Sequence, residues 1–193
     1  MVIPPQARSR KAPAWGALDA SAKRARLLAV SHQVFAREGL DAPMPAVAAA
    51  AGIGVGSLYR QFPSKHELLT ALVIERLEEV IAGAEAALGS DAGPWAALTA
   101  FLWDHCERAV GDDVLAEAIA ALQVDPAVKR VRARSTAALQ ALLDAAKAEG
   151  EVREDATALD LRLLFAAARA AEQVEAGAWR RALELGLDSL ARR

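Results

Sequence analysis

Apolar residues recur at helical spacing through most of the chain after residue 18. The first such stretch begins near Asp19 or Ser21, either of which can cap a helix, and it ends at Gly39. Its apolar face consists of Leu27, Leu28, Val30, Val34 and Phe35. Residues 1–18 instead carry three prolines and scattered basic residues with no period. We therefore expect residues 1–18 to form a disordered basic arm.

Two short helices with a glycine turn between them are predicted next. Pro45–Ala51 fits a short helix, because a proline in the first turn needs no backbone donor. The run Gly52-Ile53-Gly54 breaks that helix, and a third one, about Val55–Phe62, ends before Pro63. Two short helices joined by a turn that contains glycine predict a helix-turn-helix.

A long helix and five further helices complete the pattern. Ser64 can cap the long helix, with Glu67 three residues on, and the helix runs to about Leu88 before a glycine-rich loop. The further helices are expected at Trp95–Val110, Val114–Leu122, Pro126–Glu149, Ala156–Glu175 and Ala178–Ala191. Because strand-like alternation is nearly absent, the sequence predicts an all-α fold of about nine helices.

Composition narrows the class of protein. Hydrophobic residues make up 54% of the 193 residues, and much of that is alanine, the strongest helix former. No uncharged apolar run reaches the roughly 18 residues of a membrane span, and no signal peptide is evident at the N-terminus. The single cysteine, Cys106, excludes an internal disulfide and a multi-cysteine metal site. We therefore expect a cytoplasmic protein without metal or cofactor.

The net charge of −2 conceals an asymmetry along the chain. Up to Lys65 there are nine basic and three acidic residues, a balance of +6, while the remainder holds 14 basic and 22 acidic residues, a balance of −8. A basic head on an acidic body suits a head that meets a polyanion such as DNA. The alternative is a solvated basic tail.

The third predicted helix has one apolar and one polar face. The residues expected to pack inward are Val55, Leu58 and Phe62, and those expected to face outward are Gly56, Ser57, Tyr59 and Arg60. Such a helix can enter a major groove about 12 Å wide. Arg60 can pair with guanine or phosphate, and Ser57 and Tyr59 can donate to phosphates. Lys65 opposes the dipole of the next helix, which indicates a phosphate contact or, alternatively, a surface lysine.

Three stretches resemble the DNA-binding domain of the tetracycline-repressor (TetR) family: Arg24–Leu28, Phe35–Gly39 and Val47–Leu69. The most specific part is Gly-Ser-Leu-Tyr-Arg-Gln-Phe-Pro-Ser-Lys, residues 56–65. The resemblance implies an all-helical homodimer with an N-terminal three-helix reader and a C-terminal ligand-sensing domain. By position, the resemblance implies DNA contacts by Ser57, Tyr59, Arg60 and Lys65. We add the two glycines at the start of the same helix, Gly54 and Gly56, to this predicted DNA-binding set.

The sequence departs from the family pattern at two places. Met44 stands where the family usually has a threonine that touches phosphate, so Met44 is left out of the contact set. Gly54 stands where a serine or threonine often caps the recognition helix. Glycine caps nearly as well but lacks the hydroxyl contact.

Other function classes fit less well. A dinucleotide-binding fingerprint needs the spacing Gly-x-Gly-x-x-Gly directly after a strand. Here the glycines at 52, 54 and 56 have the spacing Gly-x-Gly-x-Gly, and the preceding segment is predicted to be helical. Cys106 beside His105 could suggest a nucleophile and base, but neighbours on a helix point about 100° apart, so a buried or pocket-lining thiol is the better interpretation. A purely structural helical protein would leave the basic head unexplained. We therefore predict a non-enzymatic protein.

The C-terminal half offers a candidate ligand pocket: Phe101, Trp103, His105, Cys106, Phe165 and Arg169. Aromatic residues at helical spacing form either a core or a pocket, and the family resemblance favours a pocket. Arg169 lies on an otherwise apolar helix. It can pair with an anionic ligand, bridge to Glu172 or reach solvent.

The last two predicted helices are expected to form the dimer interface as a four-helix bundle with their symmetry mates. The residues assigned to it are Leu159, Leu163, Ala167, Ala171, Trp179, Leu183, Leu187 and Leu190. The domains expected are the arm, 1–18, a helix-turn-helix domain, 19–65, and a helical ligand-binding and dimerisation domain, 66–193. The function predicted is a transcriptional repressor that a small molecule releases from a palindromic operator. The alternative is a helical DNA-binding protein without an effector.

Overall fold

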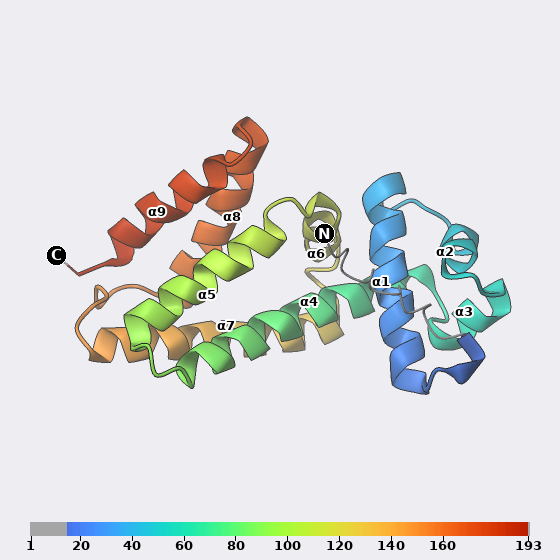
Figure 1. The fold of residues 1–193 in the computed structure, drawn as a ribbon, viewed down its shortest axis with the longest axis horizontal. Helices are drawn as coiled ribbons and strands as arrows, with labels where there is room; N and C mark the ends of the chain where they lie inside the picture. The colour runs from blue at the N-terminus through green and yellow to red at the C-terminus, as the bar shows by residue number, and fades with distance from the viewer. Residues whose placement is uncertain (1–14, 193) are drawn as a thin grey trace, which may run out of the picture.

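The computed structural model describes residues 15–192, and these residues form nine α-helices and one 3-10 turn. Figure 1 shows the first three helices gathered at one end of an elongated molecule. These are α1 (Ala20–Glu38), α2 (Met44–Ala51) and α3 (Val55–Gln61), and together we call them the reader. Residues 1–14 of the expected arm lie outside the described residues, and Trp15–Ala17 form the 3-10 turn.

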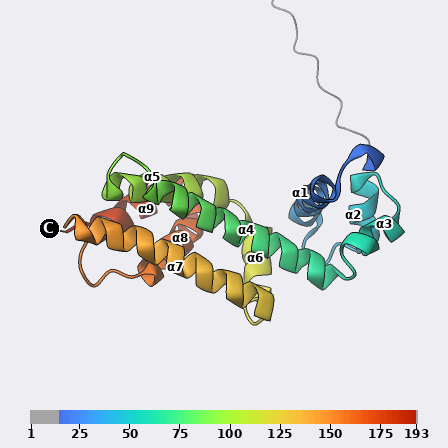
Figure 2. The ribbon, with the colours of Figure 1, turned by 90° about the horizontal axis from the view of Figure 1, so that it is seen from below.

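The remaining helices form the body, which α4 enters from the reader. They are α4 (Lys65–Leu88), α5 (Pro94–Ala109), α6 (Asp113–Ala121), α7 (Pro126–Ala148), α8 (Ala158–Val174) and α9 (Ala178–Leu190). In Figure 2, α4 and α7 lie side by side along the length of the body, and α8 and α9 cover it on one side. The all-α fold predicted from the sequence is confirmed.

Helix ends fall where capping chemistry is available. The Asp19 carboxylate accepts a hydrogen bond from the Ala22 amide at 2.7 Å and begins α1. Gly52 ends α2 in the left-handed region with a φ of 68°, a conformation that favours glycine. The Ser64 hydroxyl accepts from the Glu67 amide at 3.1 Å and begins α4. The predicted helix bounds therefore agree with the structure to within one or two residues at nearly every end.

The reader and the body have separate apolar cores. Leu27, Phe35, Leu58 and Phe62 are at most 1% exposed in the reader, and the first turns of α4 contribute Leu68 to the same cluster. The body is built around a second cluster, which includes Leu98, Leu102, Leu142, Leu143, Leu161 and Leu183. The two cores share α4, and a third, smaller cluster of Val73, Ala118, Leu122 and Val128 with Leu40 lies where the reader meets the body.

The α8–α9 pair is held together at a glycine. A Cβ added at Gly186 would overlap the side chain of Leu164, so the two helices approach closely at this point. A short β-bridge between Val152 and Ala191 ties the end of α9 to the segment before α8. These contacts fix α8, which also forms one wall of the cavity described below.

Candidate DNA-reading surface and ligand cavity

Two buried side chains anchor the third helix in the reader. Leu58 is 0% and Phe62 1% exposed, as the sequence pattern predicts. Val55 is 38% exposed, so the prediction that it packs inward is wrong. Val55 is the first residue of α3, and the helix leaves the core before its N-terminal turn is covered. The start of α3 is therefore open to solvent.

Polar side chains occupy the exposed face of α3. Tyr59 is 44% exposed, and Arg60 donates a hydrogen bond to the Ser57 hydroxyl at 2.8 Å. Nothing lies within 4 Å of a Cβ added at Gly54 or Gly56, and both residues are exposed. The glycines therefore leave the backbone at the start of α3 uncovered. The result is a polar surface with bare amide groups at a helix N-terminus, where anions bind well.

Two cations of the N-terminal half lie against aromatic rings of the reader core. The Arg24 guanidinium lies 4.6 Å from the centroid of the Phe62 ring, and the Lys65 ammonium lies 5.9 Å from the centroid of Phe35. Both rings are buried, and each attracts its cation through a cation–π interaction. Lys65 is the first residue of α4 and directly follows the Ser64 cap.

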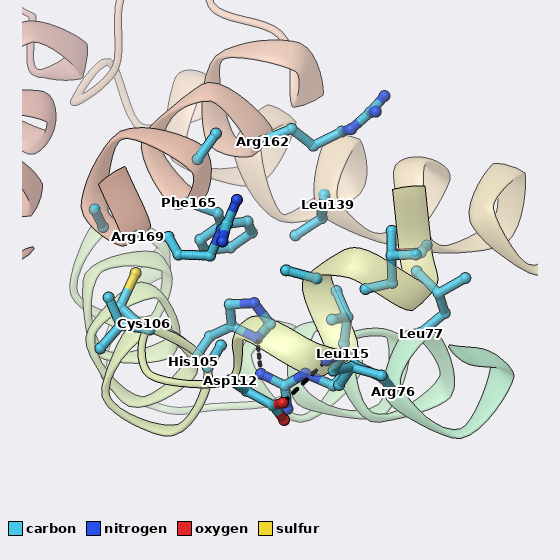
Figure 3. Close-up of a pocket in the computed structure, with 18 of the residues that line it drawn as sticks. Arg76, Leu77, His105, Cys106, Asp112, Leu115, Leu139, Arg162, Phe165 and Arg169 are labelled. Atoms are coloured by element: carbon cyan, nitrogen blue, oxygen red, sulfur yellow. Dashed lines mark hydrogen bonds between the residues drawn. The ribbon is translucent and has the colours of Figure 1, made fainter. Parts of the chain in front are cut away.

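A cavity of about 330 Å³ lies in the body between five helices. It is enclosed by α4, α5, α6, α7 and α8, and Figure 3 shows its lining. Four of the six predicted pocket residues line it: His105, Cys106, Phe165 and Arg169. The walls are mostly apolar, with Leu77, Leu115 and Leu139 on three different helices. This combination of apolar walls and a few polar groups is typical of ligand sites.

Two predicted pocket residues lie elsewhere. Phe101 packs in the core beneath the cavity, stacked on His105 with ring centroids 5.9 Å apart. Trp103 packs against Trp179 of α9 with centroids 5.5 Å apart. Phe101 lies one turn before His105 on the same face of α5, whereas Trp103 projects from another face. Neither lines the cavity, so their assignment to the lining is wrong.

His105 is a neutral hydrogen-bonding group in the cavity wall. Its Nδ1 accepts a hydrogen bond from Arg76 at 3.5 Å, and its ring contacts Phe165 with centroids 4.2 Å apart. Burial, helped by the charges of Arg76 and Arg108, lowers the pKa of His105 to about 3. Since arginine only donates, Nδ1 is the acceptor and Nε2 carries the proton. Figure 3 shows the ring between Arg76 and the interior of the cavity.

Cys106 beside it is an unreactive thiol. Burial raises the pKa of Cys106 to about 12, although Arg76 acts in the opposite direction. The thiolate needed for nucleophilic attack is therefore not formed near neutral pH. Within residues 15–192, no group of three or more His, Cys, Asp and Glu side chains could hold a metal ion.

Several lining residues were missed by sequence reasoning. The polar ones among them are Arg76, Asp112, Arg132, Ser135, Thr136 and Arg162. Arg132 lies two residues from both Arg130 and Arg134, so the helix turns it away from the face that these two share. Its place at the cavity depends on how α7 packs against α6, which a helical period does not specify.

Two histidine–aspartate pairs, one between α1 and the start of α6 and one between α4 and the start of α7, were also missed. His32 of α1 donates through Nε2 to Asp112 at 2.7 Å, and His66 of α4 donates to Asp125 at 2.9 Å. Each aspartate also caps a helix, α6 and α7 respectively. Asp112 differs from Asp125 because it lines the cavity.

The predicted dimer residues divide into two groups. Leu159 and Leu163 of α8 are each 56% exposed, and Ala167 is exposed on the same helix. Trp179, Leu183, Leu187 and Leu190 of α9 are at most 7% exposed, because they pack into the core of their own protomer. The assignment of these four residues to an intermolecular interface is therefore wrong. Ala171 is half-buried.

An all-helical body attached to a helix-turn-helix reader is the architecture of a class of DNA-binding regulators. Two family models match the chain: bacterial regulatory proteins of the tetR family over residues 27–72, and the C-terminal domain of SbtR-like transcriptional regulators over residues 93–192. The chain belongs to the TetR family of transcriptional regulators. It is accordingly a DNA-binding regulator and not an enzyme.

Solved structures agree with this assignment. The chain is similar to a TetR transcription regulatory protein from Mycobacterium vanbaalenii, with 31% identity, coverage of 88% of this chain and 95% of that one, and a TM-score of 0.66. A TetR regulator from Streptomyces coelicolor is 30% identical, with coverage of 87% and 98% and a TM-score of 0.65. The ketosteroid transcriptional regulator KstR2 of Mycobacterium tuberculosis shares the fold at 22% identity, with coverage of 91% and 98% and a TM-score of 0.64.

No curated protein matches the chain in sequence. None of the helices in residues 15–192 combines the length and apolar character that crossing a membrane requires.

Proposed function

We propose that this regulator is a homodimeric repressor that binds a palindromic operator and releases it when a small molecule enters the body cavity. One observation carries the proposal. Asp112 lines the cavity and also accepts the hydrogen bond from His32 of the reader. A ligand that contacts Asp112 or displaces α6 therefore acts on a residue that holds the reader in place.

The DNA-binding set proposed is the exposed face of α3 with the start of α4. Arg60 reads a base edge in the major groove, while Ser57, Tyr59 and Lys65 contact phosphates. Gly54 and Gly56 are exposed and have no side chain of their own, so DNA can approach the backbone at the start of α3 closely. The DNA-binding domain that we propose spans residues 19–65, and the apolar core of the reader extends into α4 as far as Leu72.

The dimer forms through the exposed face of α8. Its apolar residues are Leu159, Leu163, Ala167 and Val174, and Val174 is 87% exposed. Leu185 of α9 is 52% exposed and extends this apolar face. A two-fold axis here makes the interface isologous. It also places the two recognition helices about 34–36 Å apart, one turn of DNA, which requires a palindromic site.

The ligand acts by changing that spacing. Helix α4 belongs to both cores, since Leu68 packs in the reader and Val80 lines the cavity in the body. A displacement of α4 or α6 in the body therefore moves the reader. A ligand shifts this equilibrium only by its differential affinity for the two arrangements. A coupling free energy of about 1–3 kcal/mol would be ordinary for such a system.

The experiment begins with selection of genomic DNA fragments that the purified protein binds, followed by titration of the selected operator at fixed salt. Sedimentation of the free protein at micromolar concentration gives the oligomeric state. A dimer that binds a palindrome, and that loses affinity when a cavity ligand is added, supports the proposal. If operator affinity is the same with and without a ligand shown to occupy the cavity, the protein is a DNA-binding regulator without an effector.

A further inference from the structure

Four arginines border the cavity, and they differ in how their charges are compensated. Arg76 pairs with Glu79 at 2.7 Å, and Arg169 pairs with Asp113 at 3.0 Å. The pairing of Arg169 removes it as the first candidate for an anionic ligand, because its guanidinium already has a carboxylate. The single carboxylate in the lining, Asp112, is itself paired with His32.

Arg132 and Arg162 have no acidic partner among residues 15–192. Arg132 donates to the carbonyl oxygen of Ile119 at 3.2 Å, a neutral acceptor in the last turn of α6. Burial lowers the pKa of Arg132, and the positive charge of Arg162 lowers it further. Both side chains line the same cavity, and most of their N–H donors make no hydrogen bond with another described residue. An anion between them would relieve this repulsion.

The interior of the cavity does not suit a charged group. Apolar side chains from α4, α6 and α7 line it, among them Leu77, Ile119 and Leu139. Apart from Arg76 and Asp112, whose charges are paired with Glu79 and His32, the polar groups there are neutral. They are the Nε2 hydrogen of His105 and the hydroxyls of Thr136 and Ser135, and Ser135 makes no hydrogen bond with another described residue although it is 5% exposed. Such a cavity accepts an apolar body that carries few polar atoms.

We propose that the ligand is an organic acid, whose apolar body fills the cavity and whose carboxylate lies between Arg132 and Arg162. This inference rests on the proposed function, in which the cavity is the effector site. Each planar guanidinium presents paired N–H donors that match the two oxygens of a carboxylate. A cation is excluded by the same pair of charges. A neutral molecule would leave their repulsion in place.

The two arginines have different parts in binding. Arg132 is partly buried and held by the Ile119 carbonyl, so its position is set before the ligand arrives. Arg162 is exposed, and Figure 3 shows its side chain extending away from the cavity. We therefore expect Arg162 to turn inward over the carboxylate when the ligand binds.

Calorimetric titration with three matched probes tests the class of ligand. Decanoate, decan-1-ol and decylamine share one apolar chain and differ in charge. We expect decanoate to bind at least about tenfold more tightly than decan-1-ol, the ratio that one charge-assisted hydrogen bond supplies, and decylamine to bind worst. Decyl phosphate, added as a fourth probe, separates a preference for carboxylate from a preference for any anion.

Substitutions then locate the anion. Arg132→Gln and Arg162→Gln should each weaken decanoate binding about tenfold and leave decan-1-ol binding unchanged. Arg130→Gln is the matched control, because Arg130 is an exposed arginine of α7 that does not line the cavity. Equal loss in all three variants would show a general effect of surface charge and would overturn the assignment.

Three other results would overturn the inference. They are decan-1-ol binding as tightly as decanoate, decyl phosphate displacing decanoate at much lower concentration, or no binding of any probe. Operator affinity measured on the same samples separates this failure from a failure of the proposed function. A protein that binds its operator but does not prefer the acid contradicts only the ligand class. A protein that binds no operator contradicts the proposed function.

Discussion

The Asp112 carboxylate holds His32 through one oxygen and the N-terminus of α6 through the other. The distances are 2.7 Å to His32 Nε2 and 3.1 Å to the Leu115 amide. His32 and Asp112 are 80 residues apart in sequence, and their pairing joins the reader directly to the cavity wall. The pair is partly exposed, at 40% and 20% of the two side chains, so its effect on stability is modest while its effect on coupling is direct.

Replacing His32 with alanine should uncouple ligand from operator. The α6 cap is kept in His32→Ala, because Asp112 is unchanged, and the free energy of unfolding should fall by no more than about 1 kcal/mol. We expect ligand to weaken operator binding much less than in the parent protein. Operator titration with and without a cavity ligand measures this.

His66→Ala is the matched control for that substitution. It removes the same kind of hydrogen bond, to Asp125 at the cap of α7, but Asp125 does not line the cavity. Coupling should therefore persist in His66→Ala. If the ligand loses its effect on operator affinity equally in both variants, the His32–Asp112 pair does not transmit the effect of the ligand to the reader.

Arg60→Ala should weaken operator binding by about 1–3 kcal/mol and relax the preference for one base pair, because a base-reading guanidinium is lost. Lys65→Ala and Tyr59→Phe should weaken binding to all sequences alike, and Lys65→Ala should reduce the salt dependence by about one ion. Anisotropy titrations with operator and scrambled DNA distinguish these patterns. Arg181→Ala, an exposed arginine of α9, serves as the control and should bind DNA normally.

A charge on the exposed face of α8 should split the dimer. Leu163→Glu places a carboxylate where two copies of α8 are proposed to meet, so sedimentation should give a monomer with unchanged helical content. Val124→Glu is the control, because Val124 is 70% exposed but lies between α6 and α7. A dimer in both variants would place the interface elsewhere.

His105 should make the protein less stable in acid. Its folded pKa of about 3 lies below the ordinary value of 6.5, so the unfolded chain binds a proton that the folded chain does not between these pH values. Stability therefore decreases as pH falls through this window, by at most about 1.4 kcal/mol per pH unit from this group.

Denaturant titrations from pH 7 to pH 4 measure that slope. His105→Gln removes the titrating group, keeps a polar side chain, and should reduce the slope. Cys106→Ala is a suitable control, because it alters the same wall of the cavity without a group that titrates in acid. An unchanged slope in His105→Gln would assign the acid sensitivity to other groups.

Local signals predicted the helices well, because each depends on residues close in sequence. Asp19, Gly52 and Ser64 act as caps or breaks within a turn of their own position. It was harder to predict what the apolar face of each helix packs against. In α9, Trp179 and Leu183 form an apolar stripe suited either to a partner chain or to the protomer core, and the period is the same in both cases.

The cavity was predictable only in part for a similar reason. His105 and Phe165 stood out because polar or aromatic residues interrupt alanine-rich helices. Arg132 did not, since it is one arginine among several in α7. The pairing of His32 with Asp112 needs the arrangement of α1 against α6, which no local pattern contains.

Because the reader and the body have separate main cores, joined along α4, each can acquire substitutions during evolution without disturbing the packing of the other. Substitutions on the face of α3 that alter operator choice leave the packing around Leu98 and Leu142 intact, and substitutions in the cavity leave Leu58 and Phe62 undisturbed. The two specificities can therefore change independently, and a reader from a relative can be grafted onto this body. The graft must preserve the contacts between the two parts: an imidazole on α1 opposite Asp112, the leucines of the first turns of α4, and the apolar contacts of Leu40 and Val114.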